Sequence, residues 1–305
     1  MIERKLTAIE EESFKKITTD TLITFQQGDT NGISTILASI NLNEEECAIF
    51  CKKTPFHPVN SRWSDQPGDK GNIMVEEHTI PVIDTQTWCF NRSTMEIKSH
   101  NAIKRSDSHA WLLLIAHIVL KKECPPNLIG KNVELNVDKA YRHHLSAQHT
   151  GCHISILAFN QHLNPFWKKQ IEKDPLDSFD FNANAIETSK ISENNSIDRF
   201  RIGKSLRKKG FNHSLFLENF HTIPNQVNNT LKTWLATPAK ITMLSDAETL
   251  SSQRTWCCNL NGIPVKIPCG GTHLDSTSAL EKIEVALEKE NDETFTLITT
   301  SQLKP

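Results

Sequence analysis

Four residues of types that commonly bind metal ions occur in two short pairs that lie far apart in the sequence. His149 and His153 form an HxxxH pair, and Cys269 and His273 form a CxxxH pair. Residues four positions apart share one face of a helix, so two imidazoles at this spacing can reach one ion. The glycines at 270 and 271 allow a tight turn of the backbone around a metal. Together the two pairs predict one site with three imidazoles and a thiolate, a donor set that favours Zn²⁺.

Spacing alone is weak evidence for a metal site in this chain. With 13 His and 8 Cys among 305 residues, chance gives on the order of half an HxxxH and a third of a CxxxH. The alternative interpretation is a partly buried histidine pair on a helix and a core thiol. Each pair occurs once and in literal form, which favours the metal site.

The elements that must position the two pairs differ between the two halves of the chain. From Thr21 to about Asp138, short apolar runs alternate with Gly, Pro, Asn and Asp, as expected of strands and turns. This pattern predicts a small β-barrel or sandwich. Beyond Asp138, apolar residues recur at helical spacing over 144–163 and 215–235.

The second half also contains strand-like and irregular stretches. Residues 263–267 and 294–299 have the composition of strands, whereas 174–195 is rich in Asn, Ser and Asp and predicts irregular structure. We therefore expect an α+β protein with two domains, residues 1–138 and 139–305.

Composition limits the class of protein. Hydrophobic residues make up 37% of the chain and charged residues 23%, which is typical of globular proteins. The sequence shows no signal peptide and no apolar stretch that approaches a membrane span, so we expect a cytoplasmic protein without membrane contact. Because disulfides are rare in cytoplasmic proteins, we expect the eight cysteines to be free thiols or metal ligands, with no structural disulfide. The net charge of −2 argues against nonspecific coating of nucleic acid.

Five stretches of the sequence stand out as motifs in a fixed order. They are TPFHP at Thr54–Pro58, QPGDKG at Gln66–Gly71, GKNVELNVD at Gly130–Asp138 with Arg142, SAQHTGCH at Ser146–His153 and PCGGTH at Pro268–His273. In this order they resemble the editing domains of alanyl-tRNA synthetases and their free-standing AlaX-type relatives. The CGGTH block is the most specific part of the likeness.

The resemblance implies both a fold and an activity. The fold is an N-terminal translation-factor-like β-barrel followed by a zinc-containing α/β editing domain of the threonyl/alanyl-tRNA synthetase type. The implied activity is hydrolysis, in trans, of alanine-specific tRNA that carries serine or glycine by mistake, so the partner is tRNA and the enzyme is a carboxylic ester hydrolase. The chain lacks room for a synthetase core and contains no GxxxxGK loop, so we expect no use of ATP.

The part that zinc plays stays open at this point. The ion could orient the tRNA 3′ end or the substrate amino group while a nearby water attacks, or it could carry the attacking hydroxide itself. Four protein ligands also fill a tetrahedron, as in a structural site. The alternative functions are a deacylase for another aminoacyl-tRNA and a noncatalytic tRNA-binding module with structural zinc.

Residues beside the first ligand pair invite two further expectations. Thr150 follows the first ligand and is a candidate catalytic residue, because its hydroxyl could contact the substrate or the reacting water; the alternative is a helix residue that bonds its own backbone. Asp138 and Arg142 precede the predicted helix and could form an ion pair that fixes it, with solvated surface charges as the alternative.

A basic segment lies between the two ligand pairs and is the best candidate for tRNA phosphate contacts. It contains six basic residues and no acid, whereas the alternative is an ordinary solvated face. The residues are Arg199, Arg201, Lys204, Arg207, Lys208 and Lys209.

The chain departs from the family at one loop. Where the family has two glycines before the Gln-Pro-Gly-Asp turn, this chain has Ser64 and Asp65. In the family this loop faces the editing pocket, so side chains here predict an altered preference among small amino acids.

Overall fold

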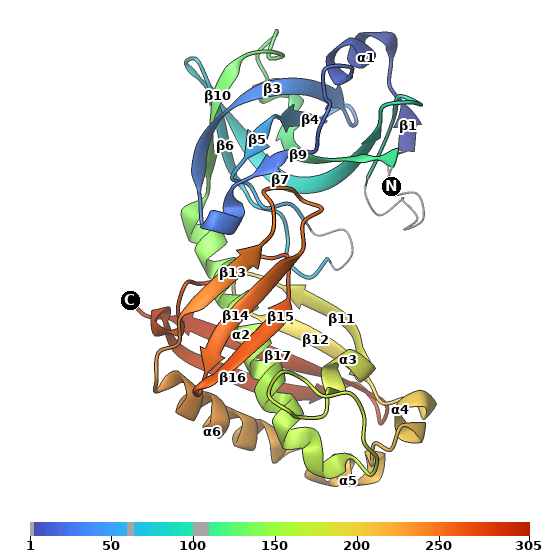
Figure 1. Ribbon diagram of the computed structural model, residues 1–305, viewed down its shortest axis with the longest axis vertical. Helices are drawn as coiled ribbons and strands as arrows, with labels where there is room; N and C mark the ends of the chain where they lie inside the picture. Colours follow the sequence, from blue (N-terminus) through green and yellow to red (C-terminus); the bar gives the residue numbers. More distant parts are fainter. Residues whose placement is uncertain (1–2, 60–63, 100–109) are drawn as a thin grey trace. The chain divides into compact units, whose positions relative to one another are not determined.

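The computed structural model describes residues 3–59, 64–99 and 110–305 and divides the chain into two compact units (Figure 1). The first unit comprises Met1–Arg142 together with Ser245–Arg254, and the second comprises His143–Leu244 and Thr255–Pro305. The sequence predicts a single boundary at residue 138. The added segment belongs to the first unit because its backbone bonds there: Ile23 N donates to Glu248 O at 3.1 Å.

The first unit is built on an eight-stranded antiparallel sheet whose order is β1-β8-β7-β6-β10-β3-β4-β9. Strand β9 also pairs with β7, so the pairings from β7 through β6, β10, β3, β4 and β9 form a closed cycle. The strands are β1 (Glu3–Lys5), β3 (Asn31–Asn41), β4 (Glu46–Cys51), β6 (Gly71–Val75), β7 (His78–Asn91), β8 (Glu96–Ser99), β9 (Leu112–Leu120) and β10 (Asn132–Val137). The likeness to translation-factor barrels in particular stays a prediction.

Alternation of apolar and polar residues determines which side of this sheet is buried. In β10, Val133, Leu135 and Val137 are buried while Glu134 is exposed, because successive side chains of a strand point to opposite faces. Smaller elements complete the unit: α1 (Ala8–Phe14), β2 (Leu22–Ile23) parallel to β5 (Lys53–Thr54), and the 3-10 turns η1 (Phe25–Gln27) and η4 (Lys121–Glu123).

A buried histidine lies within this unit. His117 is fully buried; its Nδ1 donates to Ile49 O at 3.0 Å, and its Nε2 lies 2.8 Å from the Thr54 hydroxyl. Since a carbonyl oxygen can only accept, Nδ1 carries the proton and Nε2 accepts from Thr54. Burial disfavours the charged ring and lowers the pKa of His117 to about 4.

This histidine predicts a loss of stability in mild acid. Between pH 6.5 and 4 the unfolded chain binds the proton and the folded chain does not, so stability falls as pH falls through this window. From pH 7.5 to 5 the loss is about 2 kcal/mol. The unfolding free energy of His117→Gln, measured with urea, should lack this part of the pH dependence. The control variant His78→Gln, at an exposed position, should retain it. Equal pH dependence in His117→Gln and the wild type would contradict this assignment.

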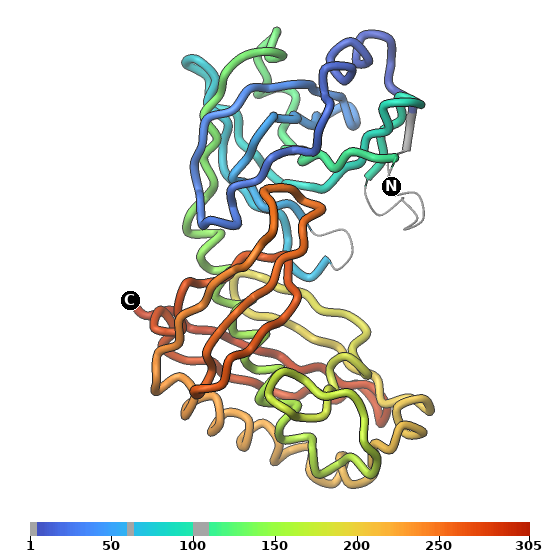
Figure 2. The backbone as a smooth tube through the Cα atoms, in the orientation of Figure 1, coloured from blue at the N-terminus to red at the C-terminus, as the bar shows by residue number. Residues whose placement is uncertain are grey.

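The second unit places one long helix among two sheets. Helix α2 (Lys139–Leu163) is buried over nearly its whole circumference from Leu145 to Asn160, where His153 and Ile156 are half-buried and every other residue is buried. Its apolar residues share a core with residues of both sheets, and Figures 1 and 2 show it crossing them. One sheet has the order β11-β12-β17-β16 and the other β13-β14-β15.

The remaining elements of this unit extend the same core. The four-stranded sheet contains β11 (Ile186–Ile191), β12 (Ser196–Arg201), β16 (Leu280–Lys289) and β17 (Thr294–Leu303), and the three-stranded sheet contains β13 (Ile241–Ser245), β14 (Arg254–Leu260) and β15 (Ile263–Pro268). The shorter helices and turns are η5 (Asn164–Phe166), α3 (Phe181–Ala185), α4 (Lys204–Lys208), α5 (His213–Asn219), α6 (Ile223–Leu235) and η6 (Thr277–Ala279).

The mixed α+β class is confirmed, and one prediction for a stretch of this unit needs correction. The stretch 174–195 contains α3 and β11, because β11 obtains its strand from pairing with β12. The helical spacing over 215–235 falls on α5 and α6, with Pro224 in the first turn of α6, where a missing N–H is tolerated. No helix among the described residues is both long and apolar enough to cross a membrane.

Candidate metal centre

The predicted ligands come together in the second unit. His149 and His153 lie one helical turn apart on α2, and their ring centroids are 4.9 Å apart. Cys269 and His273 lie in the loop that follows β15. Cys269 Sγ is 3.4 Å from His149 Nε2 and 3.3 Å from His273 Nε2. One ligand atom from each of the four residues lies within 4.8 Å of the others, so the cluster can hold a metal ion.

Burial keeps the two helix imidazoles neutral. It lowers the pKa of His149 to about 3 and the pKa of His153 well below its ordinary value, with the neighbouring His149 adding to the second effect. A neutral imidazole has a lone pair for a metal, whereas a protonated one does not. His153 Nδ1 is moreover buried without a hydrogen-bond partner, an unfavourable state for a polar atom that carries no ligand.

Hydroxyl groups connect the two halves of the cluster. Thr150 is fully buried; its Oγ1 lies 3.3 Å from His273 Nδ1 and accepts from Leu274 N at 3.1 Å. The distal nitrogen of a metal-binding histidine is commonly oriented by such a contact. Thr150 is therefore placed to position His273, and the prediction that its hydroxyl contacts the substrate or water stays a prediction. A second link joins Ser146 Oγ to Thr272 Oγ1 at 2.9 Å.

The sequence analysis did not identify Trp256, which packs beside the cluster. Its ring is fully buried on β14, with its centroid 5.1 Å from that of His153 and 6.0 Å from that of His273. The indole supplies an apolar wall that keeps water from one side of the imidazoles. No spacing in the sequence relates position 256 to the ligands, so pattern reasoning had no signal for it.

Gly151, between the two helix ligands, allows α2 to lie unusually close to β17. A Cβ at this position would stand 1.9 Å from Ser301 Oγ and 3.2 Å from Ser301 Cβ. The same strand is joined to the helix by two hydrogen bonds, from Gln148 Nε2 to Ser301 O and from Ser301 N to Gln148 Oε1, each 2.9 Å long.

We expect Gly151→Ala to destabilise the protein by about 1–3 kcal/mol and to weaken metal binding, because Ser301 must turn its hydroxyl aside and the backbones of α2 and β17 must still separate by a few tenths of an ångström to clear Ser301 Cβ. Combining it with Ser301→Gly removes the atoms in conflict and should restore most of both properties. Urea unfolding and a competitive metal titration of the single and double variants measure the effect. Unchanged stability and metal affinity in Gly151→Ala would show that the close approach is unimportant.

The predicted ion pair between Asp138 and Arg142 is absent, and each residue has a different partner. Asp138 Oδ1 accepts the backbone N–H of Tyr141 at 3.0 Å and so caps the start of α2. Arg142 donates through Nε to Asp69 Oδ1 at 2.8 Å, through Nη2 to Asp69 Oδ2, and through Nη2 to Pro55 O at 2.8 Å. The helix start is therefore bonded to the TPFHP and QPGDKG segments, and surface solvation of Arg142 is excluded because it is buried.

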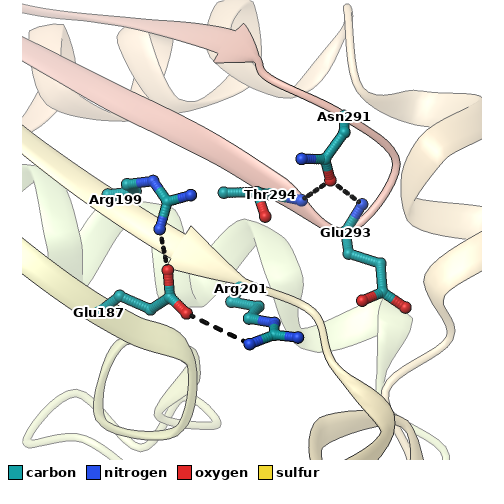
Figure 3. Close-up of a pocket in the computed structure, with 6 residues that line it drawn as sticks. All are labelled: Glu187, Arg199, Arg201, Asn291, Glu293 and Thr294. Atoms are coloured by element: carbon teal, nitrogen blue, oxygen red, sulfur yellow. Dashed lines mark hydrogen bonds and ion pairs between the residues drawn. The ribbon is translucent and has the colours of Figure 1, made fainter.

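Two arginines of the basic segment are balanced by glutamates. Arg199 Nε lies 2.9 Å from Glu290 Oε1, and its Nη1 donates to Glu187. Arg201 Nη1 is 3.9 Å from Glu187 Oε1. Figure 3 shows both arginines and Glu187 at a pocket of about 280 Å³ that Asn291, Glu293 and Thr294 also line (Figure 3). Paired charges of this kind attract phosphate less than the sequence alone indicates.

Of the four remaining basic residues, two have a polar or acidic partner and two have no acidic partner among the described residues. Arg207 Nη1 donates to Glu293 Oε1 at 2.8 Å, and this hydrogen bond lowers the pKa of Glu293. Lys209 Nζ donates to Asn184 Oδ1 at 2.7 Å. Lys204 and Lys208 are exposed on α4 and have no acidic partner within 4.0 Å among the described residues.

Ser64 and Asp65, which differ from the two glycines of the resembled editing domains, lie in the first unit. Ser64 is exposed, and half-buried Asp65 accepts the backbone N–H of Gln66 at 2.8 Å. Burial raises the pKa of Asp65 to about 6. An effect of these residues on amino-acid preference stays a prediction, and residues 60–63, just before them, lie outside the described residues.

The geometry thus unites the four predicted ligands, places Thr150 against one of them and offsets half of the basic segment. Comparison with models of protein families and with curated protein sequences found no match to this chain.

Proposed function

We propose that the protein is an AlaX-type trans-editing deacylase that binds zinc and hydrolyses mischarged aminoacyl-tRNA, with seryl- or glycyl-tRNA(Ala) as the substrate. The observation that carries the proposal is the convergence of His149, His153, Cys269 and His273 from two distant motifs. The CGGTH block, which contains Cys269 and His273, is also the most specific part of the resemblance to alanyl-tRNA editing domains. The reaction needs water and tRNA and no ATP.

The spacing of the donors supports zinc as the metal. A tetrahedral site with Zn–N bonds of about 2.05 Å and a Zn–S bond of about 2.3 Å has N···S edges of about 3.6 Å. The two N···S distances from Cys269 are 3.4 and 3.3 Å, close to this value. Three imidazoles and one thiolate are ligands that suit zinc. The donor set and these two distances therefore fit this ion.

The residues around the cluster have defined parts in the proposed reaction. Zinc bound here would supply a Lewis acid that holds the substrate's amino group or the tRNA 3′ end. Thr150 and the pair of Ser146 and Thr272 hold the ligand loop against α2, so that the ligands stay in place when substrate enters. Trp256 excludes water from one side of the imidazoles, which strengthens electrostatic interactions there.

One observation favours a second candidate, a tRNA-binding module in which zinc is structural. Four protein ligands complete a tetrahedron and leave no position for water or substrate. In that case the protein would bind tRNA and release no amino acid. A third candidate, a deacylase for another aminoacyl-tRNA, differs only in the substrate.

Substrate selectivity separates the three candidates. The zinc-containing protein is incubated with seryl-, glycyl- and alanyl-tRNA(Ala) and with seryl-tRNA(Ser), and the free amino acid is measured over time. The proposal expects release of serine or glycine from tRNA(Ala) at a rate well above that of alanine. Release from none of them, with retained tRNA binding, supports the structural module. Hydrolysis of another aminoacyl ester alone supports the third candidate.

We propose that the six basic residues form the tRNA contact, with Lys204 and Lys208 contributing most. Replacing both by Ala should weaken tRNA binding several-fold and reduce the slope of log K against log salt by about 1–2, because their charges have no acidic partner. Arg199→Gln with Arg201→Gln removes the same formal charge from glutamate-paired positions and should change both quantities less. Filter binding across a salt series measures this, and equal effects in the two double variants would argue against it.

A further inference from the structure

Two cysteines of the first unit lie in direct contact. Cys47 Sγ and Cys124 Sγ are 3.3 Å apart, although the residues are 77 positions apart in the sequence. Cys47 belongs to β4 and pairs with Val119 of β9, and Cys124 follows the 3-10 turn η4 that continues from β9. Paired strands therefore hold both residues in place. The proximity is a property of the fold.

The turn that carries Cys124 is anchored as well. Lys121 N donates to Glu45 O at 2.8 Å, and Cys124 N donates to Lys121 O at 3.1 Å. A disulfide bond is about 2.05 Å long, so the two sulfurs need to approach by about 1.3 Å from their present 3.3 Å. Side-chain rotation with a small adjustment of the turn can supply such a movement, without unpairing β4 from β9.

The two thiols differ in access. Cys124 is half-buried, whereas Cys47 is only 6% exposed. The two thiols share one hydrogen bond, in which either sulfur can donate. Cys124 is thus the sulfur that a reagent in solution reaches first. Cys47 lies where it can attack Cys124 Sγ and release the reagent bound to it.

We propose that Cys47 and Cys124 form a reversible disulfide with each other, and that the oxidant is a small-molecule disulfide such as oxidised glutathione. The Cys124 thiolate attacks one glutathione sulfur, forms a mixed disulfide and releases one glutathione thiolate. The Cys47 thiol then loses its proton to solvent, attacks Cys124 Sγ and releases the second glutathione. The protein gives up two electrons and two protons, and the oxidised glutathione is reduced to two thiols.

The test equilibrates the folded protein in buffers of increasing ratio of oxidised to reduced glutathione, followed by acid quenching and mass analysis. We expect a loss of about 2 Da, a bridged peptide pair that contains Cys47 and Cys124 after digestion without reductant, and full reversal by dithiothreitol. The bridged form should unfold at a higher urea concentration than the reduced form, because the bond restricts the unfolded chain.

Matched variants make the outcome decisive. Cys257→Ser removes a half-buried cysteine elsewhere and should leave the bridge intact, whereas Cys124→Ser should abolish it. Cys47→Ser should stop the reaction at the mixed disulfide, seen as a gain of one glutathione on Cys124. The peptide map of the wild type alone is sufficient if a variant fails to fold. A bridge between other cysteines, a mixed disulfide without a bridge, or no change at any ratio would overturn the proposal.

Discussion

The zinc content of the purified protein is expected to fall from about one ion per chain to less than about 0.1 when either His153 or Cys269 is replaced by Ala. Each substitution removes one donor from a cluster whose ligand atoms lie within 4.8 Å of one another, and the three donors that remain leave the ion exposed to exchange. Metal analysis after dialysis against a weak chelator measures the change.

Two control substitutions separate loss of a ligand from general damage. His144 lies on the same helix but is exposed, and Cys257 is a half-buried cysteine of β14 outside the cluster. Ala at either position should leave the zinc content near one per chain. Full zinc retention in both His153→Ala and Cys269→Ala would mean that the ion, if bound, is held elsewhere.

Replacing Arg142 by Met is expected to lower the free energy of unfolding by about 3–5 kcal/mol. The side chain is 7% exposed and forms two hydrogen bonds with Asp69, which is fully buried. Its loss leaves a buried carboxylate whose remaining polar contact is the backbone N–H of His57. Urea titration at neutral pH measures the change.

A double variant tests whether the uncompensated charge causes this loss. Arg142→Met combined with Asp69→Asn removes both charges and should recover a large part of the stability lost in Arg142→Met alone. Met at Lys131, whose partner Glu76 is exposed, should change the unfolding free energy little. A small effect of Arg142→Met, comparable to that of Lys131→Met, would show that the buried pair does not stabilise the fold.

The site was predictable where the chemistry depends on local spacing. The four-residue interval of His149 and His153 determines a shared helix face, and the two glycines between Cys269 and His273 indicate a turn. Partners far apart in the sequence were not predictable. Sequence proximity suggests Asp138, four positions away, as the partner of Arg142, and no pattern indicates that QPGDKG brings Asp69 to the helix start.

The same limit explains the basic segment and the polar stretch before it. Six basic residues without an acid looked like an open phosphate contact, but Glu187 and Glu290 reach Arg199 from β11 and from the turn after β16. The strand β11 lies in a stretch whose polar composition indicated a loop, and its pairing with β12 supplies the order that composition does not. The α+β class, by contrast, follows from alternation and helical spacing, which are local properties.

We propose that metal bound by the four residues is required to hydrolyse a mischarged aminoacyl-tRNA. The most direct measurement is single-turnover release of serine from seryl-tRNA(Ala) by zinc-loaded protein, by the same preparation stripped of metal, and by stripped protein to which zinc is returned. We predict release well above the spontaneous rate with zinc, a fall of at least about tenfold on stripping, and recovery when zinc is restored. Release at the spontaneous rate by the loaded protein, or an undiminished rate after stripping, would contradict the claim.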